Sequence, residues 1–247
     1  MRTILVTGGA GFIGSHLVDE LMKRGYKVVV LDDLSAGKVK NIHPWIKNDN
    51  FVFIKGSLLR KKDIRHAMKD CDTVFHLAGN ADVRIGVMDS TVHYEQNVVC
   101  TYNILEAMRE SQLCRKIIFT STSTVYGEPT IMPTPESYGP LIPISLYGAS
   151  KLACESLIAG YCNSFDFAGS IARLANIIGP RSTHGVVFDF IRKLRKNPAY
   201  LEVLGDGRQT KSYLHVYDCV SGLIAMGQKS SGGKVDIYNI GSVDRIS

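Results

Sequence analysis

The stretch that decides the fold is Thr3-Ile4-Leu5-Val6-Thr7-Gly8-Gly9-Ala10-Gly11-Phe12-Ile13-Gly14, near the start of the chain. A short apolar run with β-branched residues enters a glycine cluster, and an amphipathic segment follows. This order predicts a strand, a tight turn and a helix, which is the setting of a dinucleotide-binding loop. Gly8 suits the turn, Gly11 allows a pyrophosphate to approach, and Gly14 allows the helix to pack on its strand. Glycines also form ordinary turns, so the prediction needs support from elsewhere in the chain.

The next apolar run supplies that support. Lys27-Val28-Val29-Val30-Leu31 ends in Asp32 and Asp33, about 20 residues beyond the loop. A carboxylate at this place accepts hydrogen bonds from the adenosine ribose and repels a 2′-phosphate, so NAD is favoured over NADP. The alternative for Asp32 is a turn residue that ends a strand. Together the two segments predict a nucleotide-binding α/β domain.

Tyr147 and Lys151 form a second chemical signal. They are four residues apart in a predicted helix, so their side chains lie on one face. A nearby ammonium group favours the phenolate and lowers the pKa of a tyrosine, so we expect Tyr147 to act as a general acid and base. The same spacing occurs by chance in many helices, and only the nucleotide-binding loop gives the pair a chemical context.

Composition indicates a soluble globular enzyme. The chain has 247 residues, 45% of them hydrophobic, and a formal net charge of +6. No apolar run approaches the ~18 residues of a membrane span, and the early strand leaves no room for a signal peptide. The six cysteines lack metal-ligand spacing, so we expect reduced thiols, no metal and a cytoplasmic location. No nucleic-acid motif accompanies the positive charge, and the basic run 192–196 suits a solvated helix face.

Alternating strand and helix signals predict a doubly wound parallel sheet, a Rossmann fold. The expected strands are residues 2–7, 27–32, 51–55, 73–77, 115–120 and 167–172. The expected helices lie near 12–24, 61–70, 91–111 and 146–164. Residues 1–175 are expected to form the NAD-binding domain. Residues 176–247 are expected to combine substrate loops around a helix at 186–196 with a helix at 215–228 and a strand at 235–240 that return to that domain.

The chain resembles the extended short-chain dehydrogenase/reductase superfamily, and within it the NAD-dependent sugar-nucleotide epimerases of the UDP-glucose 4-epimerase type. The resemblance spans residues 1–247. Besides the loop and the Tyr147–Lys151 pair, it rests on these motifs: Asp32-Asp33-Leu34, Val74-Phe75-His76-Leu77-Ala78, Asn97-Val98-Val99, Thr122-Ser123-Thr124-Val125-Tyr126-Gly127 and Arg173-Leu174-Ala175-Asn176. The family's substrate region extends further than this chain, so residues 176–247 are expected to supply only part of the sugar pocket.

The resemblance implies a catalytic set of Thr122, Tyr147 and Lys151. It implies NAD contacts from these residues: Gly8, Gly11, Phe12, Ile13, Gly14, Asp32, Asp33, Ser57, Leu58, Leu77, Ala78, Asn97, Tyr147 and Lys151. It implies UDP-sugar contacts from these residues: Thr122, Tyr147, Asn176, Lys211 and Arg208, with Arg181 as a further candidate. Ser57 stands where the family usually has Asp, and Lys211 where it commonly has Arg, so both contacts are expected to be weaker. The alternative for residues 121–124 is a polar loop at a strand end.

The implied reaction is oxidation at C4 of a UDP-hexose to a 4-keto sugar, followed by reduction on the opposite face. Tyr147 moves the proton, while Lys151 binds the nicotinamide ribose and holds the pKa of Tyr147 down. Related dehydratases follow the catalytic Thr with Asp-Glu, and related decarboxylases carry Glu at the position of Thr124. Ser123 and Thr124 replace those acids here, which favours epimerisation.

Three other hypotheses stay open at this stage. One is another sugar-nucleotide enzyme on the same fold, and the second is a dehydrogenase or reductase that releases its cofactor each cycle. The third is a non-catalytic NAD-binding module. The family also implies a homodimer packed through the helices at 91–111 and 146–164, with no membrane or nucleic-acid partner.

Overall fold

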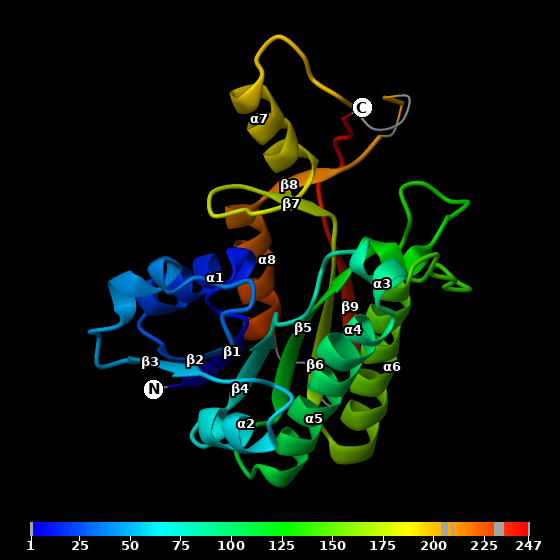
Figure 1. Ribbon diagram of the computed structural model, residues 1–247. Coiled ribbons are helices and arrows are strands. Elements are labelled where there is room, and N and C mark those ends of the chain that lie inside the picture. The colour runs from blue at the N-terminus through cyan, green and yellow to red at the C-terminus, as the bar shows by residue number, and fades with distance from the viewer. Residues whose placement is uncertain (1, 204–206, 209, 230–234, 247) are drawn as a thin grey trace.

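The computed structural model describes residues 2–203, 207–208, 210–229 and 235–246 (Figure 1). A seven-stranded sheet with the order β3-β2-β1-β4-β5-β6-β9 forms its centre, and every neighbouring pair in it is parallel. The strands are β1 (Thr3–Thr7), β2 (Lys27–Asp32), β3 (Phe51–Lys55), β4 (Thr73–His76), β5 (Lys116–Thr122), β6 (Ala168–Leu174) and β9 (Val235–Ile240). The predicted doubly wound fold is confirmed, and β9 extends the sheet beyond β6.

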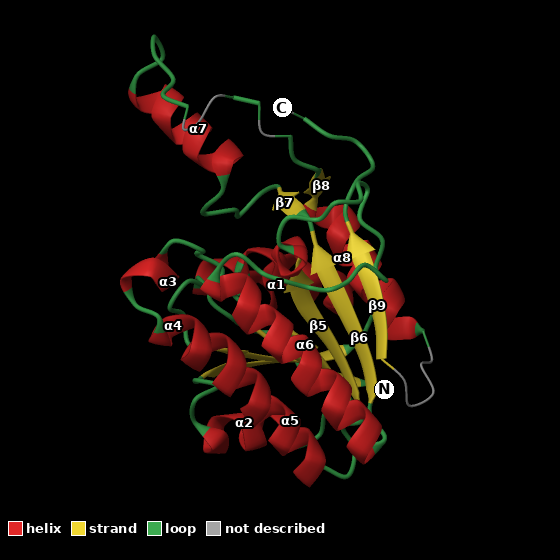
Figure 2. Ribbon diagram, turned by 90° about the vertical axis from the view of Figure 1, so that its right-hand side faces the viewer, coloured by secondary structure: helices red, strands yellow, loops and turns green. Residues whose placement is uncertain are grey.

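Helices cover both faces of this sheet (Figure 2). One face packs against α1 (Phe12–Lys23) and α8 (Val216–Gln228), and the other against α2 (Lys61–Met68), α5 (Cys100–Glu110) and α6 (Leu146–Phe165). The strands read as nearly continuous apolar runs because each contributes side chains to two cores. Phe75 and Ile118 belong to the core beneath α1 and α8, whereas Val74 and Phe119 belong to the other. Burying each such side chain stabilises the fold by about 1.5–3 kcal/mol.

The helical stretch expected at 91–111 is interrupted. It divides into α4 (Thr91–His93), a π-helical segment, η3 (Tyr94–Val99), and α5, and the short α3 (Ile85–Met88) precedes it. Within the π segment the carbonyl of Asn97 accepts a hydrogen bond from the thiol of Cys154 on α6, 3.4 Å away. The wider turn therefore presents Asn97 to the neighbouring helix, an arrangement that a helical sequence pattern does not predict.

A small second layer lies above the carboxyl edge of the main sheet (Figures 1 and 2). It consists of β7 (Asn176–Ile178), β8 (Tyr213–His215) and α7 (Val186–Lys196). β7 and β8 pair in parallel, with Asn176 opposite Tyr213. The sequence predicts α7 but neither strand, since each has three residues and needs a partner more than 30 positions away to form. The remaining short helices are η1 (Val39–Asn41), η2 (His43–Trp45) and η4 (Ser123–Tyr126).

Candidate active site

The site lies at the carboxyl ends of β1 and β4. From β1 the chain proceeds to β2 and β3 on one side of the sheet, and it then crosses to β4 on the other side of β1. In parallel α/β sheets this reversal of strand order opens a crevice at the carboxyl ends of the strands. Thr7 at the end of β1 binds the segment that follows β4: its carbonyl accepts from the N–H of Leu77 at 3.2 Å and its hydroxyl accepts from that of Ala78 at 3.2 Å. Leu77 and Ala78 therefore lie directly beside the glycine loop, against Gly8.

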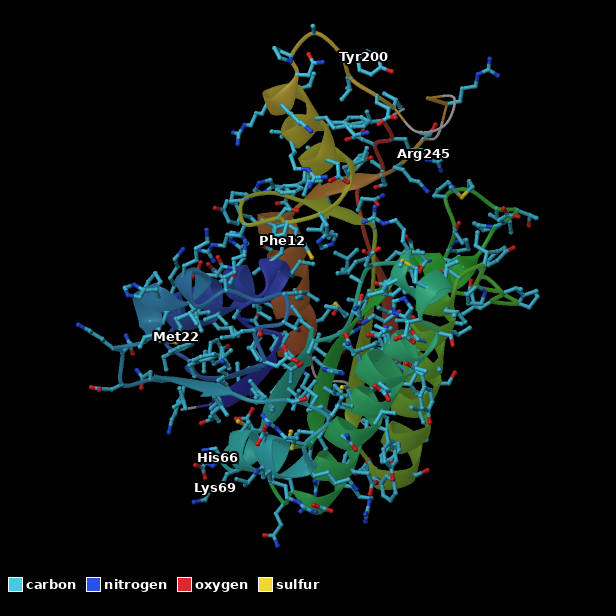
Figure 3. All side chains as sticks on the ribbon, in the orientation of Figure 1. Phe12, Met22, His66, Lys69, Tyr200 and Arg245 are labelled. Atoms are coloured by element: carbon cyan, nitrogen blue, oxygen red, sulfur yellow. The ribbon has the colours of Figure 1, made fainter. Side chains whose placement is uncertain are left out.

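Two glycines of the loop are required by its geometry. Gly8 has φ +69°, and a Cβ there would lie 2.8 Å from the backbone nitrogen of Ala78. A Cβ on Gly14 would lie only 2.1 Å from the carbonyl oxygen of Gly8. Gly11 is the N-cap of α1 and supplies no side-chain cap, so the N–H groups of Phe12 and Ile13 lack helical partners. Phe12 is labelled at this end of α1 in Figure 3, and unpaired N–H groups together with the helix dipole suit an anion.

Asp32 is held over this loop at the end of β2. Its carboxylate is buried and accepts from the N–H of Ala10 at 2.9 Å and from that of Leu34 at 2.8 Å. Burial raises the pKa of Asp32, while the two backbone hydrogen bonds oppose that rise. A carboxylate has about four acceptor positions, so two remain for ribose hydroxyls. Asp33, in contrast, is exposed and binds the N–H and hydroxyl of Ser35 at 2.9 and 2.6 Å, as a turn residue does.

The segment after β3 forms the next wall. The N–H of Ser57 donates to the carboxylate of Asp63 at 2.9 Å, and its hydroxyl accepts from Leu59 at 3.2 Å. Leu58 is buried, and its carbonyl accepts from the side-chain amide of Asn103 at 2.9 Å. The protein thus fixes the position of Ser57 through its backbone, with Asp63 nearby as an additional carboxylate.

Tyr147 and Lys151 lie on α6 as the sequence predicts, one turn apart and both buried. Ser145 caps the helix, its hydroxyl accepting from the N–H of Gly148 at 3.1 Å. A Cβ on Gly148 would lie 2.9 Å from the carbonyl oxygen of Thr124, so a glycine lets this helix start approach the turn that follows β5. Thr122, the last residue of β5, is brought to Tyr147 in this way.

The expected lowering of the pKa of Tyr147 is wrong for the polypeptide by itself. Burial raises the pKa of this phenol, and a hydrogen bond with the side chain of Thr122 lowers it only in part. Lys151 does not counter the burial because its ammonium group is directed elsewhere: it donates to the carbonyl of Thr120 at 2.9 Å and lies 4.5 Å from the centre of the Phe119 ring. His93 packs against the Tyr147 ring, with ring centroids 5.6 Å apart.

Lys151 and His76 are further buried titratable groups in this region. Burial lowers the pKa of Lys151, whereas Cys154 and Glu155 raise it. Burial and the charge of Lys151 lower the pKa of His76 to about 3, so its imidazole is neutral at ordinary pH. His76 lies within hydrogen-bonding distance of the hydroxyls of Thr7 (2.8 Å) and Thr101 (3.0 Å). It is therefore a core residue, as expected, and not a base.

Asn97 links the loop after β4 to α6. Its side chain accepts from the N–H of Asn80 at 2.8 Å and donates to the hydroxyl of Ser150 at 2.9 Å. It also lies against Gly79, where an added Cβ would be 2.8 Å from its Oδ1. Asn97 thus holds the loop after β4 in place beside Lys151.

The residues expected to bind the substrate lie in the small upper layer. Asn176 is exposed at the start of β7, and its amide donates to the carbonyl of Ser212 at 3.0 Å. The exposed Lys211 therefore lies close to it. Arg208 is also exposed, while Arg181 is committed to an ion pair with Asp19 of α1 at 2.8 Å. Asn176 thus binds the residue next to Lys211, whereas Arg181 is paired with α1.

A family model described as the NAD dependent epimerase/dehydratase family matches residues 4–241. The chain belongs to the NAD-dependent epimerase/dehydratase family. Its cofactor is NAD.

Members of this family are similar to the chain over nearly its whole length. The UDP-glucose 4-epimerase of Mycolicibacterium smegmatis is 37% identical over 249 residues, covering 98% of this chain and 77% of the relative. UDP-glucuronic acid decarboxylase 1 of Arabidopsis thaliana is 35% identical over 252 residues, covering 96% of this chain and 54% of the relative. A crystal structure of a UDP-galactose 4-epimerase is 42% identical with a TM-score of 0.88, covering 100% of this chain and 79% of that one.

The residues present fit the family's cofactor. The N–H groups at the start of α1 suit a diphosphate, and Asp32 retains acceptor positions for a ribose. The ammonium group of Lys151 lies beside Gly79, with an added Cβ there 3.4 Å from Nζ. A Cβ added at Gly8, Gly14 or Gly79 would lie under 3.0 Å from neighbouring atoms, so only glycine fits at these positions around the proposed cofactor site. In the part of the chain that the structure describes, no three His, Cys, Asp or Glu side chains come together as a metal site.

Sequence reasoning missed several residues that build the site. Thr7, Asp63, Ser150 and Glu155 each bind a residue of the expected set or its immediate neighbour. Only Glu155 carried a visible signal, since it continues the four-residue spacing of Tyr147 and Lys151.

Among the described residues, no helix is long and apolar enough to span a bilayer.

Proposed function

We propose that the chain catalyses 4-epimerisation of a UDP-hexose, with UDP-glucose and UDP-galactose as the first pair to test. The observation that carries this proposal is the convergence of Thr122, Tyr147 and Lys151 at the carboxyl edge of the sheet, together with the residues after Thr122. The UDP-sugar is inferred from the names of the relatives, which include a UDP-glucose 4-epimerase and a UDP-galactose 4-epimerase.

In this proposal the chain's own residues move one proton. Bound NAD supplies the hydride acceptor and donor that C4 chemistry requires. Tyr147 takes the proton of the 4-hydroxyl as C4 is oxidised and returns it as the 4-keto sugar is reduced. Thr122, hydrogen-bonded to Tyr147, positions the C4 oxygen. Because burial raises the pKa of Tyr147 and Lys151 is directed to the carbonyl of Thr120, the phenolate needs a further positive charge close by, which the oxidised nicotinamide ring of bound NAD would supply.

The residues after Thr122 support epimerisation over elimination or decarboxylation. Ser123 and Thr124 carry hydroxyls, which do not act as acids or bases near neutral pH. The hydroxyl and N–H of Thr124 both contact the Thr122 oxygen, each at 3.2 Å. Thr124 thus orients Thr122 instead of presenting an acid to C5 or C6 of a sugar. A UDP-glucuronate decarboxylase remains the second candidate, because such a relative covers 96% of the chain.

The direct experiment is incubation of the NAD-loaded protein with UDP-galactose, UDP-glucose, their N-acetylated forms and UDP-glucuronate, with products separated by liquid chromatography and mass spectrometry. We expect interconversion of one 4-epimeric pair without net consumption of added NAD. Release of carbon dioxide from UDP-glucuronate would favour decarboxylation instead. Stoichiometric reduction of added NAD would indicate a dehydrogenase, and no turnover of any UDP-sugar would refute the proposal.

We also propose a homodimer packed through α5 and α6. Tyr102 on α5 and Phe165 on α6 are exposed large side chains of these two helices. Light scattering coupled to size-exclusion chromatography tests this directly, and a monomeric mass across the micromolar range would contradict it.

A further inference from the structure

Three residues on one face of α6 each meet a different residue at the end of β5. Tyr147, Lys151 and Glu155 follow one another at four-residue spacing. Tyr147 binds the side chain of Thr122, and Lys151 donates to the carbonyl of Thr120 at 2.9 Å. The hydroxyl of Ser121 donates to the carboxylate of Glu155 at 2.5 Å. The first two contacts belong to the proposed chemistry, whereas Glu155 lies one turn beyond it.

Glu155 is also bound by Arg173 of β6. The Nε and Nη2 groups of Arg173 donate to the two carboxylate oxygens, with Nη2 at 2.7 Å from Oε2. The side chains of Arg173 and Glu155 are 3% and 5% exposed. Ser121 and Arg173 are directly paired between β5 and β6. The carboxylate of Glu155 is thus fixed by two adjacent strands at the same level of the sheet.

Arg173 also contacts η4, the turn that follows Thr122. Its guanidinium lies 4.8 Å from the centre of the Tyr126 ring, at the end of η4. The Tyr126 hydroxyl donates to the side chain of Asn239 on β9 at 2.8 Å. The remaining guanidinium nitrogen, Nη1, donates to the carbonyl of Glu136 at 3.2 Å. Thr122 therefore lies between two anchored points, Ser121 before it and Tyr126 after it.

A buried ion pair of this kind is a weak source of stability. Removing two charges from water costs about as much as their attraction returns, so an apolar pair of similar volume often serves folding equally well. A buried pair does, however, fix geometry, because both groups lose hydrogen bonds if they move apart. The value of this pair thus lies in where it holds α6 relative to β5.

We propose that Glu155, Arg173 and Ser121 act as positioning residues that hold α6 in register on β5 and thereby set the Thr122 hydroxyl against the Tyr147 phenol. The inference rests on the proposed function, since it assigns these residues a role in the same proton transfer. None of the three contacts the sugar in this role. Their loss should reduce the rate of the chemical step and leave substrate and cofactor binding nearly unchanged.

The decisive variant is Ser121→Ala, which removes one hydroxyl and leaves the ion pair intact. We expect kcat to fall about tenfold, with KM for the UDP-sugar and the NAD content unchanged, because misplacement by about 1 Å can cost up to 10²-fold in rate. Ser121→Thr keeps the hydroxyl and should restore most of the rate. Ser170→Ala is the matched control, since Ser170 is an equally buried serine on β6. Equal kcat for Ser121→Ala and Ser170→Ala would overturn the proposal, as would a change confined to KM.

Glu155→Gln tests the charge itself. We expect kcat to fall by about 10²-fold, more than in Ser121→Ala, because Arg173 and Ser121 both lose their anionic partner. If Glu155→Gln does not fold, the result for Ser121→Ala alone decides whether the proposal holds. A folded Glu155→Gln protein with kcat within twofold of the wild type would contradict the proposal.

A second readout needs no turnover and separates this inference from the proposed function. NMR of protein with 13C-labelled lysine follows the titration of Lys151, assigned with Lys151→Met. Burial lowers the pKa of this ammonium group, Cys154 and Glu155 raise it, and His76 and His93 face it as imidazoles whose own pKa values are lowered. Glu155→Gln should therefore lower the pKa of Lys151, and Ser170→Ala should not. If the wild type turns over no UDP-hexose but this shift is seen, the proposed function fails while the role of the Glu155 carboxylate as a charged anchor beside Lys151 stands. If no shift is seen in folded Glu155→Gln protein, Glu155 does not act on this face of α6 and the positioning proposal is overturned.

Discussion

The carboxyl edge of the main sheet and the small layer above it hold their polar side chains in opposite ways. At the sheet edge, Asp32, Thr122 and Lys151 are buried, and each is bound by backbone or neighbouring side chains. In the upper layer, Asn176 and Lys211 are exposed, and the contacts that place them involve the backbone. The first region is preorganised for one chemistry, whereas the second leaves its side chains available to a ligand. Under the proposed function, reaction type and substrate choice therefore have separate structural origins in this fold.

Tyr147→Phe tests the buried region at the reacting atom and has the largest expected effect. Loss of a general acid and base lowers turnover by at least ~10²-fold, while the phenyl ring preserves the packing against His93. Steady-state assays and the absorbance of released NAD measure the two quantities. Tyr161→Phe is the control, because Tyr161 lies on the same helix and binds Glu106 on α5. Near-normal turnover of Tyr147→Phe would remove this residue from the mechanism.

Acid should destabilise the buried region through His76. Its folded pKa is about 3, and an unfolded histidine titrates near 6.5. The stabilising contribution is therefore present above pH ~6.5 and is lost as pH falls towards 3, at roughly 1.4 kcal/mol per pH unit. Urea unfolding between pH 4.5 and 7.5 gives the slope. His76→Gln should flatten it, although His16 and His93 also have lowered pKa values. An unchanged slope in that variant would exclude His76 as the cause.

Asp32→Asn extends the comparison to the cofactor side of the sheet edge. An amide replaces a carboxylate that accepts from Ala10 and Leu34, and it leaves weaker acceptors for a ribose. We expect NAD affinity to fall about tenfold, on the scale of one charged hydrogen bond. Isothermal titration of NAD-stripped protein measures it. Asp49→Asn, at an exposed carboxylate before β3, should match the wild type, and equal affinities for all three proteins would leave Asp32 without a role.

Lys211→Met should have the smallest effect, because it tests the open region. An exposed charge contributes up to about 1 kcal/mol, so KM for the UDP-sugar should rise at most about fivefold while kcat stays unchanged. The difference from the wild type should shrink as salt is added. Lys196→Met on the exposed face of α7 provides the control. A fall in kcat without a change in KM would show that the upper layer takes part in the chemical step.

Most of the buried region was predictable because its signals are local. The glycine loop, Asp32 and the Tyr147–Lys151 spacing each depend on a strand or helix whose pattern is visible within a few residues. The direction of the pKa shift of Tyr147 was not predictable, since the burial of its side chain depends on how the rest of the fold packs around it. Ser121 and Arg173 are brought together only by the register of β5 on β6. β7 forms only by pairing with β8, which lies far from it in the sequence. Long-range pairing was thus the limit of prediction.

The six cysteines can report which part of this fold opens to solvent. All are buried, and burial raises the pKa of Cys71, Cys100, Cys114 and Cys219 to about 12. A thiol reagent therefore reacts only when the segment that covers the thiol opens. Cys219 lies on α8 and Cys154 on α6, on opposite faces. Mass spectrometry of pulse-alkylated protein can thus record which face opens first, without any introduced label.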